Sequence, residues 1–373
     1  MNNLKRIGIL LAIFTVLILF SVGYKGNDIQ ARAIVLGVGI DLQPNGDLYV
    51  TAEIVSPGNG GEEVGTFTKT VSAAGKTVAE ALKEIAVKSG KETSLGQMVL
   101  IVLGEDYIKT DFTDTADYFI RSDSCKESAI ICCCEGRAEK LLNSGDAVAQ
   151  SVSLSLADKL KGLAKEVAIP ASDLLSYVRS QMELFHTGFL NYVTFEESQN
   201  ICSTNPEQKQ GFFVADRVAV FRQNSIVGIL DAQETKGFAI LYDDVSGNVF
   251  PVKDDEKYFT LRANSKSVDA KQKDGVVTMS VEMKVKLSRT DSFGAGGLFT
   301  AKTESEIPQE MLDQVKEQSL ALATLFLNKQ VEWEFDLLNI HEIFRQKYGS
   351  TEEITTLPMK EIPVKLSISV KEK

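Results

Sequence analysis

The residues Ala33-Ile34-Val35-Leu36-Gly37-Val38-Gly39-Ile40 decide the class of fold, because they form a continuous apolar run of strand length. A turn containing Pro44-Asn45-Gly46 follows this run. From Leu48 to Val55 the chain then alternates, with an apolar side chain at every second position. Two such runs around a turn are typical of a β-hairpin, which we expect over residues 33–55.

The period of the apolar residues changes after this hairpin. Val78, Leu82 and Ile85 recur at helical spacing, which predicts an amphipathic helix over Thr77–Lys88. Strands and helices then interleave up to about residue 145, which indicates an α/β layer. The other strands expected there are Thr66–Ser72, Met98–Leu103 and Ala129–Cys134, and the other helices are Phe112–Arg121 and Arg137–Leu142.

The rest of the chain contains a second set of strands and helices. Two helices, Leu154–Val167 and Ser172–Phe185, precede a polar, turn-rich stretch from Thr187 to Gly211 that we expect to separate two domains. Asp231 with Glu234 is typical of a capping box at the start of a short helix. The remaining elements expected are the hairpin Phe212–Arg222 with Ser225–Leu230, the strands Tyr258–Val268, Val276–Leu287 and Ile362–Val370, and a long helix from about Pro308 to Gln330.

These elements predict an α+β fold with several domains, in which mixed β-sheets are flanked by helices behind an N-terminal hydrophobic helix. The length of the chain also suggests two or three domains. We expect a membrane anchor or signal segment at 1–26, an N-terminal α/β domain with trailing helices at 27–210, a small hairpin–helix segment at 211–255 and a C-terminal α+β domain with the long helix at 256–373.

The N-terminus has the features of a membrane-spanning segment. Lys5 and Arg6 precede Ile7–Tyr24, a run of 18 residues without a charge. As a helix this run is roughly 27 Å long, close to the hydrocarbon thickness of a bilayer. Lys5 and Arg6 would stay in the cytoplasm, so the chain after Tyr24 should lie on the outer side of the membrane. A signal peptide cleaved after Gly23 is the alternative, and we expect the uncleaved anchor. The anchor residues are Ile7, Leu10, Leu11, Ile13, Phe14, Val16, Leu17, Ile18, Leu19 and Phe20.

Composition argues against several classes of function. The 373 residues carry a formal charge of −11, whereas binding of nucleic acid needs a basic surface. The same charge argues against a broad basic face for anionic lipids. His186 and His341 are the two histidines, so chemistry built on several imidazoles is nearly excluded. Five cysteines are too few for a disulfide scaffold.

Two glycine-containing motifs have the appearance of nucleotide-binding loops without their full pattern. Gly75-Lys76-Thr77 has Thr70 where a phosphate-binding loop needs another glycine, so we expect a turn that leads into a helix. Gly37 and Gly39 are not followed by a third glycine and a helix, so we expect small residues there because another strand packs closely against this one.

Other reactive residues do not form a catalytic pattern. We expect Cys132-Cys133-Cys134 to pack in a buried strand, with a disulfide involving Cys125 or Cys202, or a metal site, as the alternatives. His341-Glu342 lacks the second histidine of a zinc-protease helix. The sequence therefore predicts no catalytic, cofactor or metal site, and no enzyme. Carboxylates expected at the surface include Asp41, Asp47, Glu53, Glu62 and Glu63.

An ordered set of motifs resembles one known family. The likeness covers about residues 23–372, and each motif is weak while their order is more specific. The resemblance is to the C subunits of bacterial spore nutrient-germinant receptors, the Ger(x)C family. The segments that carry it are 33–41 (Ala-Ile-Val-Leu-Gly-Val-Gly-Ile-Asp), 49–55, 71–78, 99–105, 218–230 with 234–237, and 336–340 with Phe344-Arg345.

The resemblance implies a three-domain mixed α/β body on the outer face of the inner spore membrane. It also implies that the chain acts with a multi-span A subunit and a transporter-like B subunit in sensing amino acids, sugars or nucleosides, without enzymatic activity. One departure from the family pattern is clear. Tyr24 follows Gly23 where members usually have an acylated cysteine, and no cysteine occurs before Cys125. We therefore expect no lipid attachment there, so that the hydrophobic run itself must hold the protein at the membrane.

Together these observations predict a non-catalytic, membrane-anchored extracytoplasmic subunit of a nutrient germinant receptor in spore germination. Its expected partners are the membrane and the A-type and B-type receptor subunits, and neither nucleic acid nor a cofactor. The alternative is a membrane-tethered binding protein that itself captures a small solute in a cleft between its domains.

Overall fold

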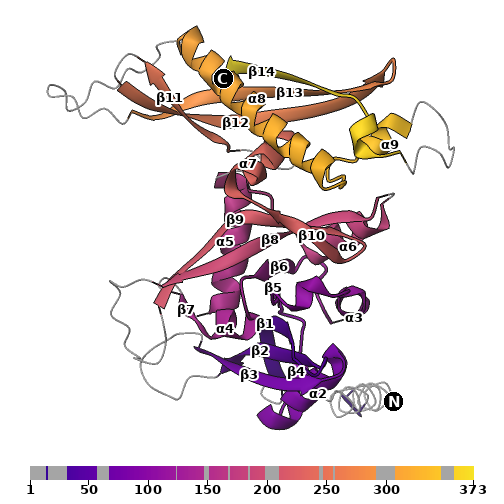
Figure 1. The fold of residues 1–373 in the computed structure, drawn as a ribbon. Coiled ribbons are helices and arrows are strands. Elements are labelled where there is room, and N and C mark those ends of the chain that lie inside the picture. The colour runs from indigo at the N-terminus through magenta and orange to yellow at the C-terminus, as the bar shows by residue number, and fades with distance from the viewer. Residues whose placement is uncertain are drawn as a thin grey trace, which may run out of the picture.

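The computed structural model describes residues 14–15, 32–56, 67–122, 124–146, 151–166, 169–183, 185–197, 210–242, 247–254, 257–290, 307–345 and 357–373. These residues form two β-sheets with helices packed against them (Figure 1). The first sheet belongs to the N-terminal half of the chain and the second to the C-terminal half.

The first sheet combines a parallel centre with antiparallel flanks. Its central strands run parallel, and an antiparallel pair extends the sheet on each side. Its strands, in spatial order, are β10 (Ser225–Leu230), β9 (Gln210–Arg222), β8 (Thr187–Glu197), β6 (Ile130–Cys134), β5 (Leu100–Leu103), β1 (Arg32–Leu42), β2 (Leu48–Ser56) and β3 (Phe67–Gly75), with β4 (Glu92–Ser94) beside β1 and β7 (Gly145–Asp146) beside β9.

Helices cover both faces of this sheet, because its strands are apolar on both sides. One face packs on a core that includes Ile85 of α2, Phe119 of α3 and Tyr177 of α6. The opposite face packs on Leu142 of α4 and Leu156 of α5. The helices are α2 (Val78–Ser89), α3 (Thr113–Arg121) and α6 (Leu174–Met182) on the first face, with the 3₁₀ turn η2 (Tyr107–Lys109), and α4 (Ala138–Asn143) and α5 (Val152–Glu166) on the second.

Helix α2 begins and ends where its sequence predicts. The side chain of Thr77 accepts a hydrogen bond from the backbone N–H of Glu80, and Gly90 ends the helix in the left-handed conformation, at φ 66°. The predicted turn into a helix at Gly75-Lys76-Thr77 is therefore confirmed.

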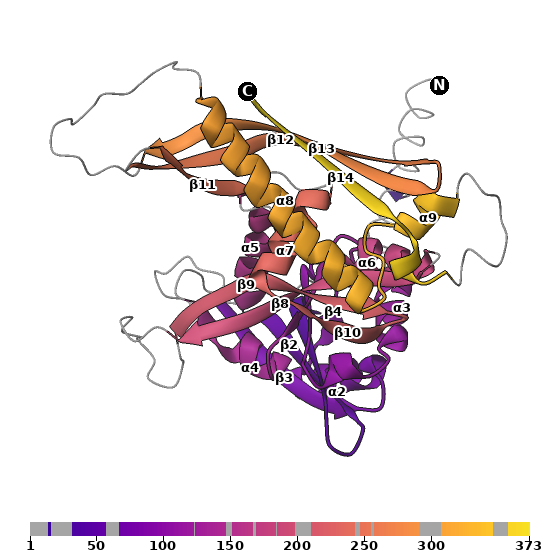
Figure 2. The same ribbon diagram turned by 45° about the horizontal axis from the view of Figure 1, so that its top comes forward.

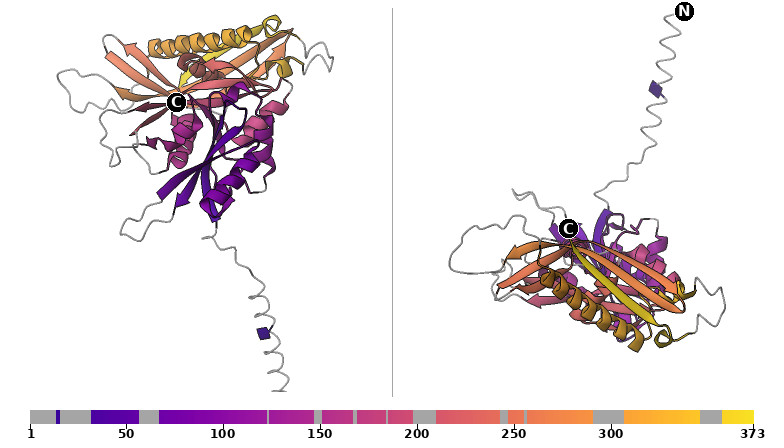
Figure 3. Two further views of the ribbon diagram at one scale, coloured as in Figure 1. Left: turned by 60° about the horizontal axis from the view of Figure 1, so that its bottom comes forward. Right: turned by 90° about the horizontal axis from the view of Figure 1, so that it is seen from above.

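The second sheet contains three antiparallel strands and one parallel strand at its edge. The order is β11 (Val249–Asp254), β12 (Lys257–Lys273), β13 (Val276–Thr290) and β14 (Val364–Glu372), and β14 runs parallel to β13. The long helix α8 (Gln309–Glu332) lies along one face of this sheet (Figures 2 and 3). The short helix α9 (Ile340–Arg345) and the 3₁₀ turn η3 (Met359–Glu361) pack on the same core.

Helix α7 (Ala232–Leu241) lies between the two sheets (Figure 1). Its capping box is formed as expected, since Asp231 and Glu234 exchange side-chain and backbone hydrogen bonds. The Phe238 ring contacts Phe189 of β8 and Phe326 of α8, with ring centroids 5.1 and 5.2 Å apart. Helix α7 therefore joins the cores of the two halves.

The polar boundary expected over residues 187–211 is wrong at its start. Residues 187–197 form strand β8, which is buried along most of its length between β6 and β9. The hairpin β9–β10 joins this same sheet. A mixed α/β fold with mixed sheets and flanking helices is confirmed. The N-terminal hydrophobic helix lies almost wholly outside the described residues, and the division into domains at 27–210, 211–255 and 256–373 stays a prediction.

Candidate functional site

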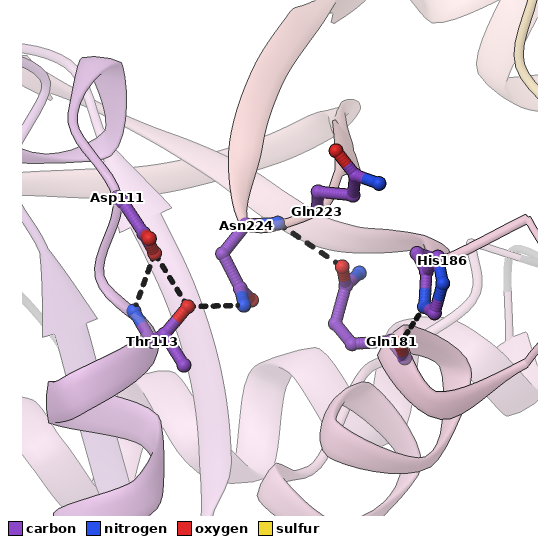
Figure 4. Close-up of a pocket in the computed structure, with 6 residues that line it drawn as sticks. All are labelled: Asp111, Thr113, Gln181, His186, Gln223 and Asn224. Carbon is purple, nitrogen blue, oxygen red and sulfur yellow. Dashed lines mark hydrogen bonds between the residues drawn. The ribbon is translucent and has the colours of Figure 1, made fainter.

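A surface pocket of about 310 Å³ lies where the α3 end of the first sheet meets the β9–β10 turn (Figure 4). It opens among polar side chains that come from four separate parts of the chain. Its lining residues are Asp111, Thr113, Gln181, His186, Gln223 and Asn224.

Backbone conformation brings these residues together. Gln223 and Asn224 form the turn of the β9–β10 hairpin, at φ 51° and 57°, and His186 has φ 49° just before β8. The N–H of Gln223 donates to the carbonyl of His186 at 2.9 Å. Left-handed residues other than glycine are uncommon and cluster at functional sites. The turn at Gln223-Asn224 was expected from the sequence, whereas the strained conformation of His186 was not.

Asn224 organises the hydrogen bonds of the pocket. Its Nδ2 donates to Oγ1 of Thr113 at 2.7 Å, its backbone N–H donates to Oε1 of Gln181 at 3.1 Å, and its Oδ1 accepts from the hydroxyl of Tyr177 at 2.9 Å. The Thr113 hydroxyl in turn donates to Asp111 (Figure 4). The amide nitrogen Nε2 of Gln181 is buried without a partner in the structure. The pocket is thus rigid, with an unused donor beside it.

The chemistry available in this pocket is hydrogen bonding. Nδ1 of His186 is turned toward the carbonyl of Gln181, so it does not contact the Thr113 hydroxyl. The Thr113 hydroxyl is held on two sides, since it donates to Asp111 and accepts from Nδ2 of Asn224. The pocket can therefore hold a small polar molecule through hydrogen bonds.

The outer side of α8 forms a second surface feature. Leu320 and Leu325 are 41% and 37% exposed there, and they border a shallow groove of about 440 Å³. The other lining residues are Glu317, Ala321, Thr324 and Asn328. An exposed apolar helix face of this kind is suited to contact with another protein.

The predicted anchor residues lie outside the described part of the chain, apart from Phe14. Ile7, Leu10, Leu11, Ile13, Val16, Leu17, Ile18, Leu19 and Phe20 are the anchor residues of which the structure gives no description. Phe14 is helical and its side chain is 64% exposed. Among the described helices none combines the length and the apolar character needed to cross a bilayer.

The cysteine run packs in the core, as expected. Cys132 and Cys134 face the core beside α4 and α5, and Cys133 faces the opposite core. All three thiols and that of Cys125 are free, and Cys202 lies outside the described residues. Burial raises the pKa of Cys125 to about 11 and that of Cys132 still further. Within the described ranges no group of three acidic, histidine or cysteine side chains could hold a metal ion.

Asp41 and Glu53 are buried, so the expectation that both lie at the surface is wrong. Asp41 accepts hydrogen bonds from the backbone N–H groups of Ala138 and Glu139, at 2.7 and 2.9 Å. Glu53 accepts from those of Val152 and Ser153. The β1–β2 hairpin thereby caps the N-termini of α4 and α5 with two carboxylates. Their role is structural.

Gly37 and Gly39 allow those two helices to approach the sheet. A Cβ at Gly37 would overlap the Ser153 side chain of α5, and one at Gly39 would come within 3.0 Å of Ala138 Cβ in α4. Close packing at these glycines is confirmed, but the expectation that another strand packs there is wrong, because the atoms nearest to an added Cβ belong to α5 at Gly37 and to α4 at Gly39.

His341 joins the two halves of the protein at a second place. Its Nδ1 lies 2.9 Å from Oδ2 of Asp336, and its Nε2 lies 2.9 Å from the carbonyl of Leu357. The ring of Phe185, which precedes β8, stacks on the imidazole with centroids 3.6 Å apart. Both ring nitrogens of this histidine therefore have hydrogen-bond partners, and one face of the ring is covered by Phe185.

Comparison with known proteins gives two matches along the chain. A family model described as "Spore germination protein N-terminal domain" matches residues 25–195. A second, described as "Spore germination B3/ GerAC like, C-terminal", matches residues 216–371. No curated protein matches this chain.

A solved structure titled "Crystal Structure of the GerBC protein" is similar in fold, with a TM-score of 0.50 and 17% sequence identity. The alignment covers 90% of this chain and 96% of that one. At this identity the likeness supports the fold alone. The ordered motifs and the two matched domains agree along nearly the whole chain. The chain belongs to the GerAC-like family of spore germination proteins, with the N-terminal and the C-terminal domain of that family.

Proposed function

We propose that this protein is a membrane-anchored, non-catalytic subunit of a nutrient germinant receptor, with its body on the extracytoplasmic side of the inner spore membrane. The observation that carries the proposal is the match of both family domains, in order, over residues 25–195 and 216–371. The partners that we propose are the A-type and B-type receptor subunits, which the family resemblance implies. Its task is then to assemble or stabilise that receptor by protein–protein contact.

The surface chemistry supports a role in contact. The α8 groove exposes Leu320 and Leu325 to solvent. Apolar side chains on a helix face can be covered by a partner helix. This groove is therefore a candidate contact with another receptor subunit.

Deletion of the gene tests the proposed role. We expect the deletion strain to respond weakly to nutrients, while a trigger that bypasses the receptors still germinates its spores normally. Re-expression of the chain restores the nutrient response. Unchanged nutrient germination, in a strain without a paralogue of this chain, would contradict the receptor role.

The anchor is tested separately with Leu17→Arg. An arginine at the centre of a spanning helix costs about 2.5–3.5 kcal/mol on insertion scales, so we expect part of the protein to leave the membrane fraction. Leu17→Val is the matched control and stays membrane-bound. If Leu17→Arg also stays fully bound, the proposed anchor is wrong.

The polar pocket favours a second candidate function, the capture of a small solute. Calorimetry of the full chain in neutral detergent with amino acids, sugars and nucleosides tests it. Binding at micromolar concentration that Asn224→Ala abolishes would support a solute-binding role. Gln309→Ala, an exposed amide on α8 far from the pocket in sequence, is the control and should leave binding unchanged.

A further inference from the structure

The second sheet has one face that no described element covers. The opposite face of β12, β13 and β14 packs on α7 and α8 through residues such as Val281 and Met283, which are buried. Side chains alternate along a strand, so the intervening positions point away from this core. We call these positions the outer sheet face. They are Arg262, Ser265, Ser267, Asp269, Lys271 and Lys273 of β12, Thr278, Ser280, Glu282, Lys284 and Lys286 of β13, and Lys365, Ser367, Ser369 and Lys371 of β14.

The charge of the outer sheet face is opposite to that of the protein as a whole. It carries six lysines and one arginine against two carboxylates, whereas the whole chain has a formal charge of −11. Both carboxylates are already paired, Asp269 with Lys271 and Glu282 with Lys371. The negative net charge of the chain therefore conceals a localised basic surface.

Like charges lie directly opposite one another at one end of this face. Strand pairing places Lys284 beside Lys371, and Lys286 beside Arg262. Opposed like charges on neighbouring strands destabilise a sheet. Glu282 moderates this repulsion in part, and the hydrogen bond from Lys371, with a smaller effect from Lys284, lowers the pKa of Glu282. The lysines Lys284 and Lys286 are exposed and have no acidic partner among the described residues.

These features point to an anion as the natural neighbour of this face. The positions named above are hydroxyl-rich and their side chains are polar rather than apolar, so an apolar contact with them is disfavoured. An acidic surface brought against it would relieve the repulsion between Lys284 and Lys371. Because the rest of the protein is acidic, an acidic partner would be attracted to this basic face alone, which orients the two molecules as they associate.

The position of the face favours a protein over a lipid surface, a step that rests on the proposed anchoring. Strand β1 begins at Arg32 in the first sheet, whereas the outer sheet face points away from that sheet (Figure 1). Residues 25–31 between the expected anchor and β1 can span only about 25 Å when extended. The outer sheet face is then directed away from the bilayer that holds the anchor.

We infer that the outer sheet face of β12–β14 binds a carboxylate-rich surface of a partner protein. Lys284, Lys286 and Lys371 form the centre of the contact, and the serines of β12 and β14 supply hydrogen bonds at its edges. Because the ammonium groups are solvent-exposed before binding, the contact is sensitive to salt.

The test uses the full chain in neutral detergent and labelled poly-L-glutamate as the probe, followed by fluorescence anisotropy. The test variant is Lys284→Gln/Lys286→Gln/Lys371→Gln. The control variant, Lys83→Gln/Lys140→Gln/Lys161→Gln, removes the same charge from exposed helix positions of the N-terminal half. We expect the test variant to bind about 10-fold more weakly than wild type and the control to bind as wild type does, with the difference lost at high salt.

Three results would overturn the inference: equal binding by wild type and the test variant, equal loss in the control variant, or a preference of wild type for phosphatidylglycerol over phosphatidylcholine vesicles that the test variant loses. The last result would assign the face to the membrane. Failure of the receptor role can be distinguished from failure of the proposed contact, because the receptor role is measured by the germination of the deletion strain. If deletion has no effect while the test variant still loses poly-L-glutamate binding, the contact stands and the receptor role falls.

Discussion

The indole ring of Trp333 lies against the backbone of Gly228, so closely that a Cβ at Gly228 would be 2.5 Å from Cζ3 of the ring. Gly228 belongs to β10 at the edge of the first sheet, at a point where the register with β9 shifts. Trp333 caps the C-terminal end of α8. This contact joins the two halves of the protein, and Trp333 is the single tryptophan of the chain.

Replacing Gly228 by valine should displace the indole ring. Overpacking of this kind costs about 1–3 kcal/mol, so we expect a lower thermal midpoint together with a red-shifted tryptophan emission. Gly162→Ala is the control, because a Cβ at Gly162 meets no other group. An unchanged emission spectrum for Gly228→Val would contradict the contact.

Glu53→Gln should destabilise the start of α5. The amide places an NH₂ group where a carboxylate oxygen now accepts from Val152 or Ser153, which leaves one buried N–H without a partner. The expected loss is about 1–3 kcal/mol in urea unfolding followed by circular dichroism. Glu84→Gln, at an exposed position of α2, should change the stability by less than about 0.5 kcal/mol. Equal effects of the two substitutions would refute the capping role.

Asp41 gives a prediction for the pH dependence of stability. Burial raises the pKa of Asp41 above its ordinary value of 3.8, against the opposing effect of the N–H groups of Glu139 and Ala138. The folded state then keeps a proton at pH values where the unfolded chain has lost it, so the free energy of unfolding falls as the pH rises through the folded-state pKa. Relative to Asp41→Asn, the wild type should therefore lose stability as the pH rises above about 4.

Urea unfolding of both proteins at several pH values between 4 and 7 checks this prediction. Asp41→Asn does not titrate at this position, so the difference between the two curves isolates the carboxyl group. A wild-type advantage that grows with pH would show that the helix N-terminus and Arg137 outweigh burial at this site.

The cysteines of β6 should be unreactive in the folded protein. Their thiols are buried, and burial raises the pKa of Cys133 and Cys134 as well as that of Cys132. In a Cys202→Ser background we expect the half-buried Cys125 to react slowly with Ellman's reagent at pH 8. With a pKa of about 11, roughly one Cys125 in 1,000 is a thiolate at that pH.

Unfolding in guanidinium chloride should release the remaining thiols together. The count of reactive groups then rises from one slow group to four. Rapid reaction of more than one cysteine in the folded protein would mean that β6 is not the buried central strand described above.

Much of the fold could be predicted from the sequence, since local patterns determine it. The helix after Gly75-Lys76-Thr77, the Asp231 cap, the turn at Gln223-Asn224 and the long helix α8 depend on neighbouring residues, and each was correctly predicted. The error at β8 had a visible cause. Residues 189–195, Phe-Leu-Asn-Tyr-Val-Thr-Phe, are mostly apolar, as expected of a buried strand, but the polar residues after Glu197 favour a loop.

The features that were missed depend on residues far apart in the chain. The donors that Asp41 and Glu53 meet are 97 to 100 residues away, so a local reading can assign those carboxylates only to solvent. The pocket at Asn224 is assembled from Asp111, Thr113, Gln181 and His186, none of which has a distinctive pattern. The outer sheet face becomes visible only once the pairing of β13 with β14 places Lys284 beside Lys371.

Helix α7 has a mechanical consequence for the whole subunit. Phe238 is held between rings from both halves, Gly237 lies against the Leu322 carbonyl of α8, and Lys266 of β12 donates to the carbonyl of Ala239 at 2.5 Å and to that of Tyr242. A hinge needs loosely packed residues around its axis, whereas these residues of α7 are tightly packed against both halves. We therefore expect a displacement imposed on one end of the subunit to be transmitted to the other, as through a stiff spacer.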